Sequence, residues 1–300
     1  MITIRNILCP VDRSDISLRA LTIATGLAKW YDARLRVIEV IGLPEPSFGP
    51  APMAVYGLTQ DVRRGVADEL ERFTDPAREA GVDVRVSVEE GDVVNGILAE
   101  ADAVTADLVV LGTHGRRGVE RLTLGSVAEK VLRRARCPVL TVPPAPRVLP
   151  PGEALFKRIL CAVDFSDASL NGLEFALSLA KEADARIAIV HVIDWPADRT
   201  IPTELAEAVS GIRTDWEARL RQQLHALVPL SACDWCTPEE LLVVGRPADE
   251  ILRLAREREE EAIVLGVHGR GAIDLALFGS TTHRVVREAP CPVFTIRSRQ

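Results

Sequence analysis

The chain has 300 residues and a mass of 32.7 kDa, about twice the usual size of one globular domain, so two domains are expected. Hydrophobic residues make up 47% and charged residues 26%, with a mean hydropathy of +0.12, which excludes a disordered or collagen-like chain. The net charge of −7, without a basic stripe, argues against a nucleic-acid partner.

Apolar runs in the sequence are strand-sized, and the start MITIRNILCPVD lacks the regions of a signal peptide. We therefore expect a cytoplasmic protein without a membrane partner. Six cysteines are too few for a disulfide scaffold, and four of them lie in strand-like apolar runs. This usage favours a reducing compartment.

In the first half, short apolar runs alternate with amphipathic ones, which is typical of parallel strands joined by helices. Helices are expected where apolar residues recur at spacings of three and four, around residues 18–28, 62–73, 97–101 and 127–134. The Pro-rich residues 43–57 are expected to form a loop. The five predicted strands are NILCPV, RLRVIEVI, VDVRVSVEE, DLVVLG and PVLTV.

The second half repeats the first. Ile7 matches Ile159 at an offset of 152 residues, and Gly91 matches Gly245 at an offset of 154, with a second variable loop at residues 194–202. A Pro-rich linker over 143–151 separates a first domain, 1–146, from a second, 152–300. The second set of strands is RILCAV, RIAIVHVI, ELLVVG, AIVLG and PVFTI.

We therefore predict an α/β fold: two doubly wound, Rossmann-like, five-stranded parallel sheets of order 3-2-1-4-5, with helices on both faces. In that order the fifth strands, PVLTV and PVFTI, lie at sheet edges. Bare apolar edges invite pairing. Each copy therefore offers an apolar edge strand for pairing.

A glycine pattern, G-2X-G-9X-GS, follows the fourth strand in both halves. A glycine after a strand permits a positive φ and a close backbone approach, and the helix that begins at Gly-Ser offers N–H groups to a phosphate. A tight turn with an ordinary helix cap is the alternative for either copy alone. The matched residues are Gly112, Gly115, Gly125 and Ser126 in the first copy and Gly266, Gly269, Gly279 and Ser280 in the second.

An aspartate ends the first strand of each copy, at Asp12 and Asp164, and a serine follows two residues later, at Ser14 and Ser166. If strands one and four are neighbours, these acids face the glycine pattern across the switch point of the sheet, where ligands bind in such folds. The acids could accept a hydrogen bond from a nucleoside. Alternatively, they could cap the next helix.

These residues, with PVDRS, AVDFS, GTHG, GVHG and CPV, resemble the universal stress protein family, and the resemblance covers both halves. It implies a tandem of the ATP-binding branch, whose two copies pair through their fifth strands as a pseudo-two-fold unit. It also implies a stress or signalling regulator rather than an enzyme, with Mg²⁺ bound through the phosphates. Ala162 departs from the family proline, and Thr281 stands where the first copy has Val127. The implied nucleotide contacts are Pro10, Val11, Asp12, Val40, Gly112, His114, Gly115, Gly125, Ser126 and Val127 in the first copy, and Ala162, Val163, Asp164, Val192, Gly266, His268, Gly269, Gly279, Ser280 and Thr281 in the second.

Alternative functions remain open at this point. A nucleotide-using enzyme, either a slow ATPase or an adenylyl transferase, is one, although the chain has no HxGH, SGGxDS or Walker motif. A thiol redox sensor through Cys233 and Cys236 is another. His114 and His268 could serve as general bases or as polar loop residues. No catalytic residue and no protein-held metal are predicted. The expected partners are ATP, a second copy in a homodimer and an unidentified signalling protein.

Overall fold

The computed structural model describes residues 2–42, 60–114, 124–144, 156–194, 206–229, 232, 236, 238–267 and 279–297. The chain divides into two compact units, Met1–Leu155 with Pro292–Thr295, and Phe156–Cys291 with Ile296–Gln300. The predicted loops at 43–57 and 194–202, except for Asp194, lie outside the described residues, as does the linker beyond residue 144.

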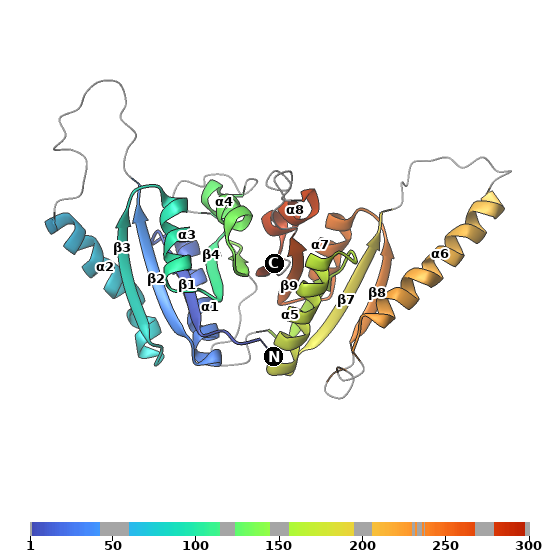
Figure 1. Ribbon diagram of the computed structural model, residues 1–300, viewed down its shortest axis with the longest axis horizontal. Coiled ribbons are helices and arrows are strands. Elements are labelled where there is room, and N and C mark those ends of the chain that lie inside the picture. The colour runs from blue at the N-terminus through green and yellow to red at the C-terminus, as the bar shows by residue number, and fades with distance from the viewer. Residues whose placement is uncertain are drawn as a thin grey trace, which may run out of the picture. The chain divides into compact units, whose positions relative to one another are not determined.

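The first unit contains the five strands that the sequence predicts. They are parallel, and their order is β3-β2-β1-β4-β5, which confirms the predicted 3-2-1-4-5 arrangement. The elements, shown in Figure 1, are β1 Asn6–Pro10, α1 Asp15–Tyr31, β2 Arg34–Ile41, α2 Gln60–Glu79, β3 Val84–Glu90, α3 Val93–Ala103, β4 Leu108–Gly112, α4 Ser126–Arg134 and β5 Val139–Val142.

The second unit repeats this order as β9-β6-β7-β8, again with parallel neighbours. In Figure 1, α6 lies along β8, as α2 lies along β3 in the first unit. The elements are β6 Arg158–Ala162, α5 Asp167–Ala183, β7 Arg186–Ile193, α6 Ala206–Ala226, β8 Glu239–Val244, α7 Pro247–Glu257, β9 Ala262–Val267, α8 Ser280–Glu288 and β10 Val293–Arg297.

Strand β10 is the fifth strand of the second copy, yet its residues 293–295 belong to the first unit. There they pair antiparallel with β5, with Phe294 opposite Leu140. Two buried threonines reinforce the pair: the Thr141 hydroxyl donates to the Val293 carbonyl and the Thr295 hydroxyl to the Val139 carbonyl. The expectation that the two fifth strands pair with each other is confirmed.

Helices cover both faces of the first sheet, with α1 beside α2 and α3 beside α4. The apolar stripe of α1 is buried at Leu21, Ala24, Leu27 and Ala28, as its spacing predicts, whereas Leu18 is exposed. Likewise Leu70 of α2 is buried but Val62 is exposed. Both exceptions lie in the first turn of their helices.

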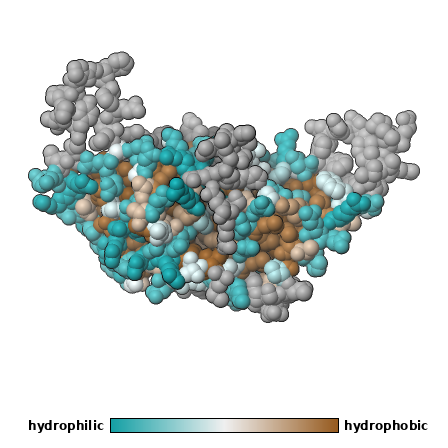
Figure 2. Space-filling view, viewed as in Figure 1, coloured by the Kyte–Doolittle hydropathy of each residue, from teal (hydrophilic) through white to brown (hydrophobic). Residues whose placement is uncertain are grey.

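Side chains of the two cores are mostly aliphatic, and the large buried residues include Ile7, Leu140 and the aromatic Phe156. Hydrophilic residues cover much of the described surface in Figure 2, with hydrophobic ones gathered between them. No described helix is both long and apolar enough to cross a membrane.

Among the residues that the structure describes, six that are not glycine have left-handed backbone conformations, and they fall into matched pairs between the copies. The pairs are Arg13 (φ 60) with Phe165 (φ 66), Asp32 (φ 51) with Asp184 (φ 47), and Thr105 (φ 48) with Glu259 (φ 57). Such conformations are unfavourable for residues with a Cβ. The repeat therefore preserves backbone shape even where the side chain differs.

Candidate functional site

The site lies where the chain changes faces of the sheet. Strand β1 leads to α1 on one face, whereas its neighbour β4 leads to α4 on the other. Leu8 pairs with Val109, and this register continues to place Val11 beside Gly112. In the second copy, Ala162 pairs with Leu265, which places Val163 beside Gly266. The first-strand turn and the fourth-strand loop therefore meet at one edge in each copy, as in ligand-binding folds of this kind.

Asp12 holds the turn that follows β1. Its Oδ1 accepts from the Ser14 N–H at 3.1 Å and from the Ser14 hydroxyl at 2.6 Å. Ser14, in turn, caps α1 by accepting from the Ser17 N–H at 3.3 Å. The alternative that the aspartate itself caps the helix is wrong, because the serine does so.

The second copy repeats this turn atom for atom. Asp164 Oδ1 accepts from the N–H and hydroxyl of Ser166, at 3.0 and 2.5 Å, and Ser166 caps α5. One oxygen of each aspartate is thus committed to local structure. Asp12 is partly buried and Asp164 is exposed.

The residue after each aspartate differs between the copies, together with its partner on the second strand. In the first copy, Arg13 Nε lies 3.0 Å from the buried carboxylate of Glu39, and Arg13 also pairs with Glu69 of α2. In the second copy, the ring of Phe165 packs against that of His191, with centroids 4.5 Å apart.

Sequence reasoning missed these pairs. An alignment of the two copies contains the signal. At the offset of 152 residues, position 13 matches 165 and position 39 matches 191, and the residue type differs between the copies at both members of the pair. An ion pair and a ring pair thus occupy equivalent places beside Val40 and Val192.

Gly112 and Gly266 are needed for packing rather than for a positive φ. A Cβ on Gly112 would lie 2.5 Å from Ile16 Cγ2 of α1, and one on Gly266 would lie 2.3 Å from the Ser169 nitrogen of α5. Neither has a positive φ; among the described glycines that conformation occurs at Gly81, Gly91 and Gly245. Of the two properties that a glycine permits here, the close approach is present at Gly112 and Gly266, because a helix passes too close for any side chain, and the positive φ is not.

Gly125 and Gly279 precede α4 and α8. Their φ values are −59° and −50°, and no described side chain caps either helix. The Gly125 N–H donates to the Thr113 carbonyl at 2.8 Å, while a Cβ on Gly279 would meet nothing within 4 Å. Two helices thus begin with N–H groups that have no side-chain acceptor, a setting that attracts anions.

His114 follows β4 directly and is 7% exposed. Its Nδ1 lies 3.0 Å from the Thr113 hydroxyl, and its Nε2 is buried without a hydrogen-bond partner among the described residues. No described carboxylate bonds to the ring. Gly115, His268 and Gly269 lie outside the described residues.

The remaining predicted residues fall at the same edges. Val40 near the end of β2 packs against α3, where a Cβ on Gly96 would lie 3.0 Å from its methyl groups. Val11 and Val163 are buried, with their N–H groups bonded to the second strand. At the strand ends and helix starts lie Pro10, Ala162, Val192, Ser126, Val127, Ser280 and Thr281.

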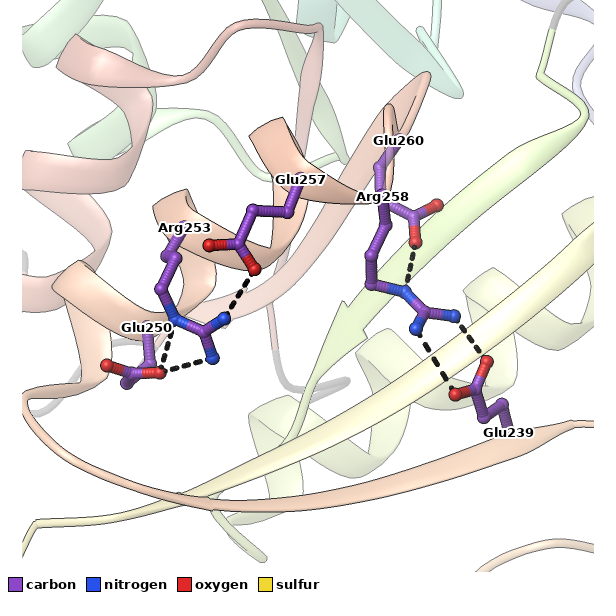
Figure 3. A network of polar contacts seen from close by, with 6 residues as sticks. All are labelled: Glu239, Glu250, Arg253, Glu257, Arg258 and Glu260. Atoms are coloured by element: carbon purple, nitrogen blue, oxygen red, sulfur yellow. Dashed lines mark hydrogen bonds and ion pairs between the residues drawn. The ribbon is translucent and has the colours of Figure 1, made fainter.

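A network of ion pairs lies elsewhere, around α7 and the turn that follows it (Figure 3). Arg258 bonds to Glu239 and to buried Glu260, and Arg253 bonds to Glu250 and Glu257. Burial raises the pKa of Glu260 despite the attraction of Arg258. Arg258 and Glu260 precede β9, at the opposite end of the strand from the glycine pattern, so this network is structural.

Two of the described cysteines are buried within first strands. Burial raises the pKa of Cys161 to about 12 and that of Cys9 still further above its ordinary range. Neither thiol therefore ionises near neutral pH, and ionisation is what makes a cysteine reactive. Cys233 lies outside the described residues.

The fold and its two matched edges define the class of protein: a duplicated, doubly wound α/β chain. The model of the universal stress protein family matches residues 3–143 and again 155–297, so the chain belongs to that family and carries it in tandem. This confirms the resemblance seen in the motifs.

Individual relatives agree with this assignment. A universal stress protein of Methanocaldococcus jannaschii is 37% identical over 139 residues, covering 46% of this chain and 81% of the relative. One of Mycobacterium tuberculosis is 27% identical over 280 residues, covering 88% of this chain and 87% of the relative. The crystal structure of a universal stress protein from Archaeoglobus fulgidus has the same fold, with a TM-score of 0.71, 24% identity and 98% of each chain covered.

Proposed function

We propose that this chain binds ATP at two sites, one at the switch point of each copy, and acts as a nucleotide-dependent regulator rather than an enzyme with fast turnover. The observation that supports this most is the double occurrence of one arrangement. In each copy, the turn held by the aspartate after the first strand lies beside the fourth strand, β4 or β9. The helix that follows this fourth strand, α4 or α8, begins without a side-chain cap from its N-cap glycine. Such a helix end suits a phosphate.

Each part of the site has a role in the proposal. The N–H groups at the starts of α4 and α8 would bind phosphate oxygens, with Ser126 and Ser280 adding hydroxyls. Asp12 and Asp164 would accept from the nucleoside, and the backbone of Val40 and Val192 would bond the base edge. Mg²⁺ would enter with the phosphates, since the described residues contain no group of three potential metal ligands.

Titration calorimetry of the full chain with MgATP tests this proposal. We expect a stoichiometry near two. A value near one would mean that a difference such as Ala162 disables one copy, and an absence of binding would refute the proposal. GTP under the same conditions is the control for base selectivity.

A homodimer, a signalling partner and a cytoplasmic location also belong to the proposal. Light scattering after size exclusion measures the oligomeric state, and a mass of one chain with and without MgATP would contradict the dimer. The thiol-sensor alternative depends on Cys233 and Cys236, and Cys233 lies outside the described residues. An adenylyl transferase would need catalytic groups that neither the motifs nor the described residues provide.

A further inference from the structure

His191 lies on β7, and its imidazole makes a hydrogen bond whose direction is fixed. Nδ1 lies 2.8 Å from the carbonyl oxygen of Val163. A carbonyl only accepts, so Nδ1 carries the proton and donates it to Val163. The equivalent residue of the first copy, Glu39, is a carboxylate that pairs with Arg13, and such a group has no proton to donate to Val11. The imidazole therefore makes a bond to the main chain that the ion pair of the first copy cannot make.

This bond falls on the peptide unit that joins Val163 to Asp164. The paired register of β6 and β7 ends at Ala162, so this peptide unit lies just past the regular ladder of the sheet. Its carbonyl accepts from His191, and its N–H donates to Ser169 Oγ at 3.2 Å. Because the peptide unit is bonded on both sides, its orientation is fixed, and with it the direction in which the aspartate side chain leaves the main chain.

His191 also contacts the residue that follows Asp164. The rings of Phe165 and His191 have centroids 4.5 Å apart and an interplanar angle of 44°. Phe165 has a φ of 66°, which is unfavourable for a residue with a Cβ and persists only where the surroundings hold it. One imidazole thus holds both neighbours of Asp164, Val163 through a hydrogen bond and Phe165 through a ring contact.

We propose that His191 is the positioning residue of the second site and that it directs the Asp164 carboxylate towards the nucleoside through the two residues beside it. This inference rests on the proposed function, in which Asp164 accepts from the nucleoside. In the first copy, the ion pair of Arg13 and Glu39 occupies the equivalent place. The two sites therefore differ in the group that orients their aspartate, and a substitution of His191 affects only the second.

Two substitutions test this role in the full chain. His191→Asn retains an N–H donor near the position of Nδ1, whereas His191→Leu has the same branched shape without a donor. Each is combined with Ser126→Asp, which places a carboxylate at the start of α4 to repel phosphate and leaves the second site for titration with MgATP. The matched control is Ser280→Asp at the start of α8, which leaves the first site.

In the Ser126→Asp background, we expect His191→Leu to weaken MgATP binding about tenfold, the scale of one hydrogen bond, and His191→Asn to stay within about twofold of the parent. In the Ser280→Asp background, neither substitution should change the affinity. Urea unfolding of the same proteins measures the cost in stability separately. If His191→Leu lowers stability but not the affinity of the second site, or if His191→Asn weakens binding equally, His191 is a packing residue and the inference fails.

Nitrogen NMR of the parent chain tests the hydrogen bond without a substitution, and His191→Asn serves to assign the signals. At about pH 8, where an ordinary imidazole is neutral, we expect the proton on Nδ1. A proton on Nε2 instead would overturn the inference even if His191→Leu does not fold, and the proposed function would stand. If the parent chain binds no MgATP at either site, the proposed function fails, and the positioning role fails with it.

Discussion

Glycines of one motif serve different physical purposes. Gly112 and Gly266 let a helix pack against the end of the fourth strand, where a Cβ would collide with Ile16 or with the backbone of Ser169. Gly279 stands in open space at a negative φ. No described atom therefore requires residue 279 to lack a side chain.

The first prediction compares two of these glycines. Gly266→Ala should destabilise the second unit by about 2 kcal/mol or more, because a close-packed backbone must move. Gly279→Ala should change the free energy of unfolding by less than about 0.5 kcal/mol, since no atom obstructs the new methyl group. Urea unfolding monitored by circular dichroism measures both. Equal losses in the two variants would contradict the packing account of Gly266.

At the scale of single elements, the sequence predicted most of this structure. Apolar runs such as DLVVLG became strands, and the spacing of Leu21, Ala24 and Leu27 predicted the buried side of α1. Periodicity could not show that Leu18 and Val62, in the first turns of α1 and α2, are exposed. Nor could it show that Ser14 rather than Asp12 caps α1, because both residue types are good caps and only geometry separates them.

Glu260 gives a prediction for pH dependence. Because burial raises its pKa in the folded state, the protonated form is favoured there. Its contribution to stability is full below the ordinary glutamate pKa and is lost as pH rises through the raised value. Glu260→Gln should remove this loss, so the variant should be at least as stable as the parent at pH 7.

Glu288 serves as the control for Glu260, because its pKa is shifted in the opposite direction. The Arg287 hydrogen bond, followed by the charge of Arg284, lowers the pKa of Glu288, so the small contribution of Glu288 is lost as pH falls. Melting temperatures measured from pH 4 to 8 should therefore converge for Glu260→Gln and the parent at the acid end. Those for Glu288→Gln should differ from the parent mainly at neutral pH. The same dependence of melting temperature on pH in both variants would contradict the opposite pKa shifts of Glu260 and Glu288.

On the scale of the whole molecule, the boundary of the repeat and the boundary of the folded units do not coincide. Residues 293–295 are part of the second copy by sequence but pair with β5 in the first unit. The sequence predicted this pairing from the apolar edge strands and the family resemblance. It could not predict the register, which the paired donors Thr141 and Thr295 help to fix.

This arrangement predicts which substitutions act on the same unit. Thr141→Val and Thr295→Val should each cost about 1 kcal/mol, the usual value of one hydrogen bond, and should shift the same unfolding transition. Ser166→Ala, which removes the cap of α5, should act on the other unit. Calorimetric scans measure the transitions. Distinct transitions for the two threonine variants would contradict the unit boundaries.

The three matched pairs of left-handed residues have a consequence for protein engineering. Two of the pairs carry different side chains on one backbone conformation, arginine and phenylalanine at 13 and 165 and threonine and glutamate at 105 and 259, whereas aspartate stands at both 32 and 184. Each copy thus shows which side chains the other copy can accept at these positions. Replacing a residue of one copy by its counterpart from the other introduces a side chain that already adopts a left-handed backbone conformation at that position. Such exchanges therefore suit the design of a chain in which one copy is altered without new backbone strain.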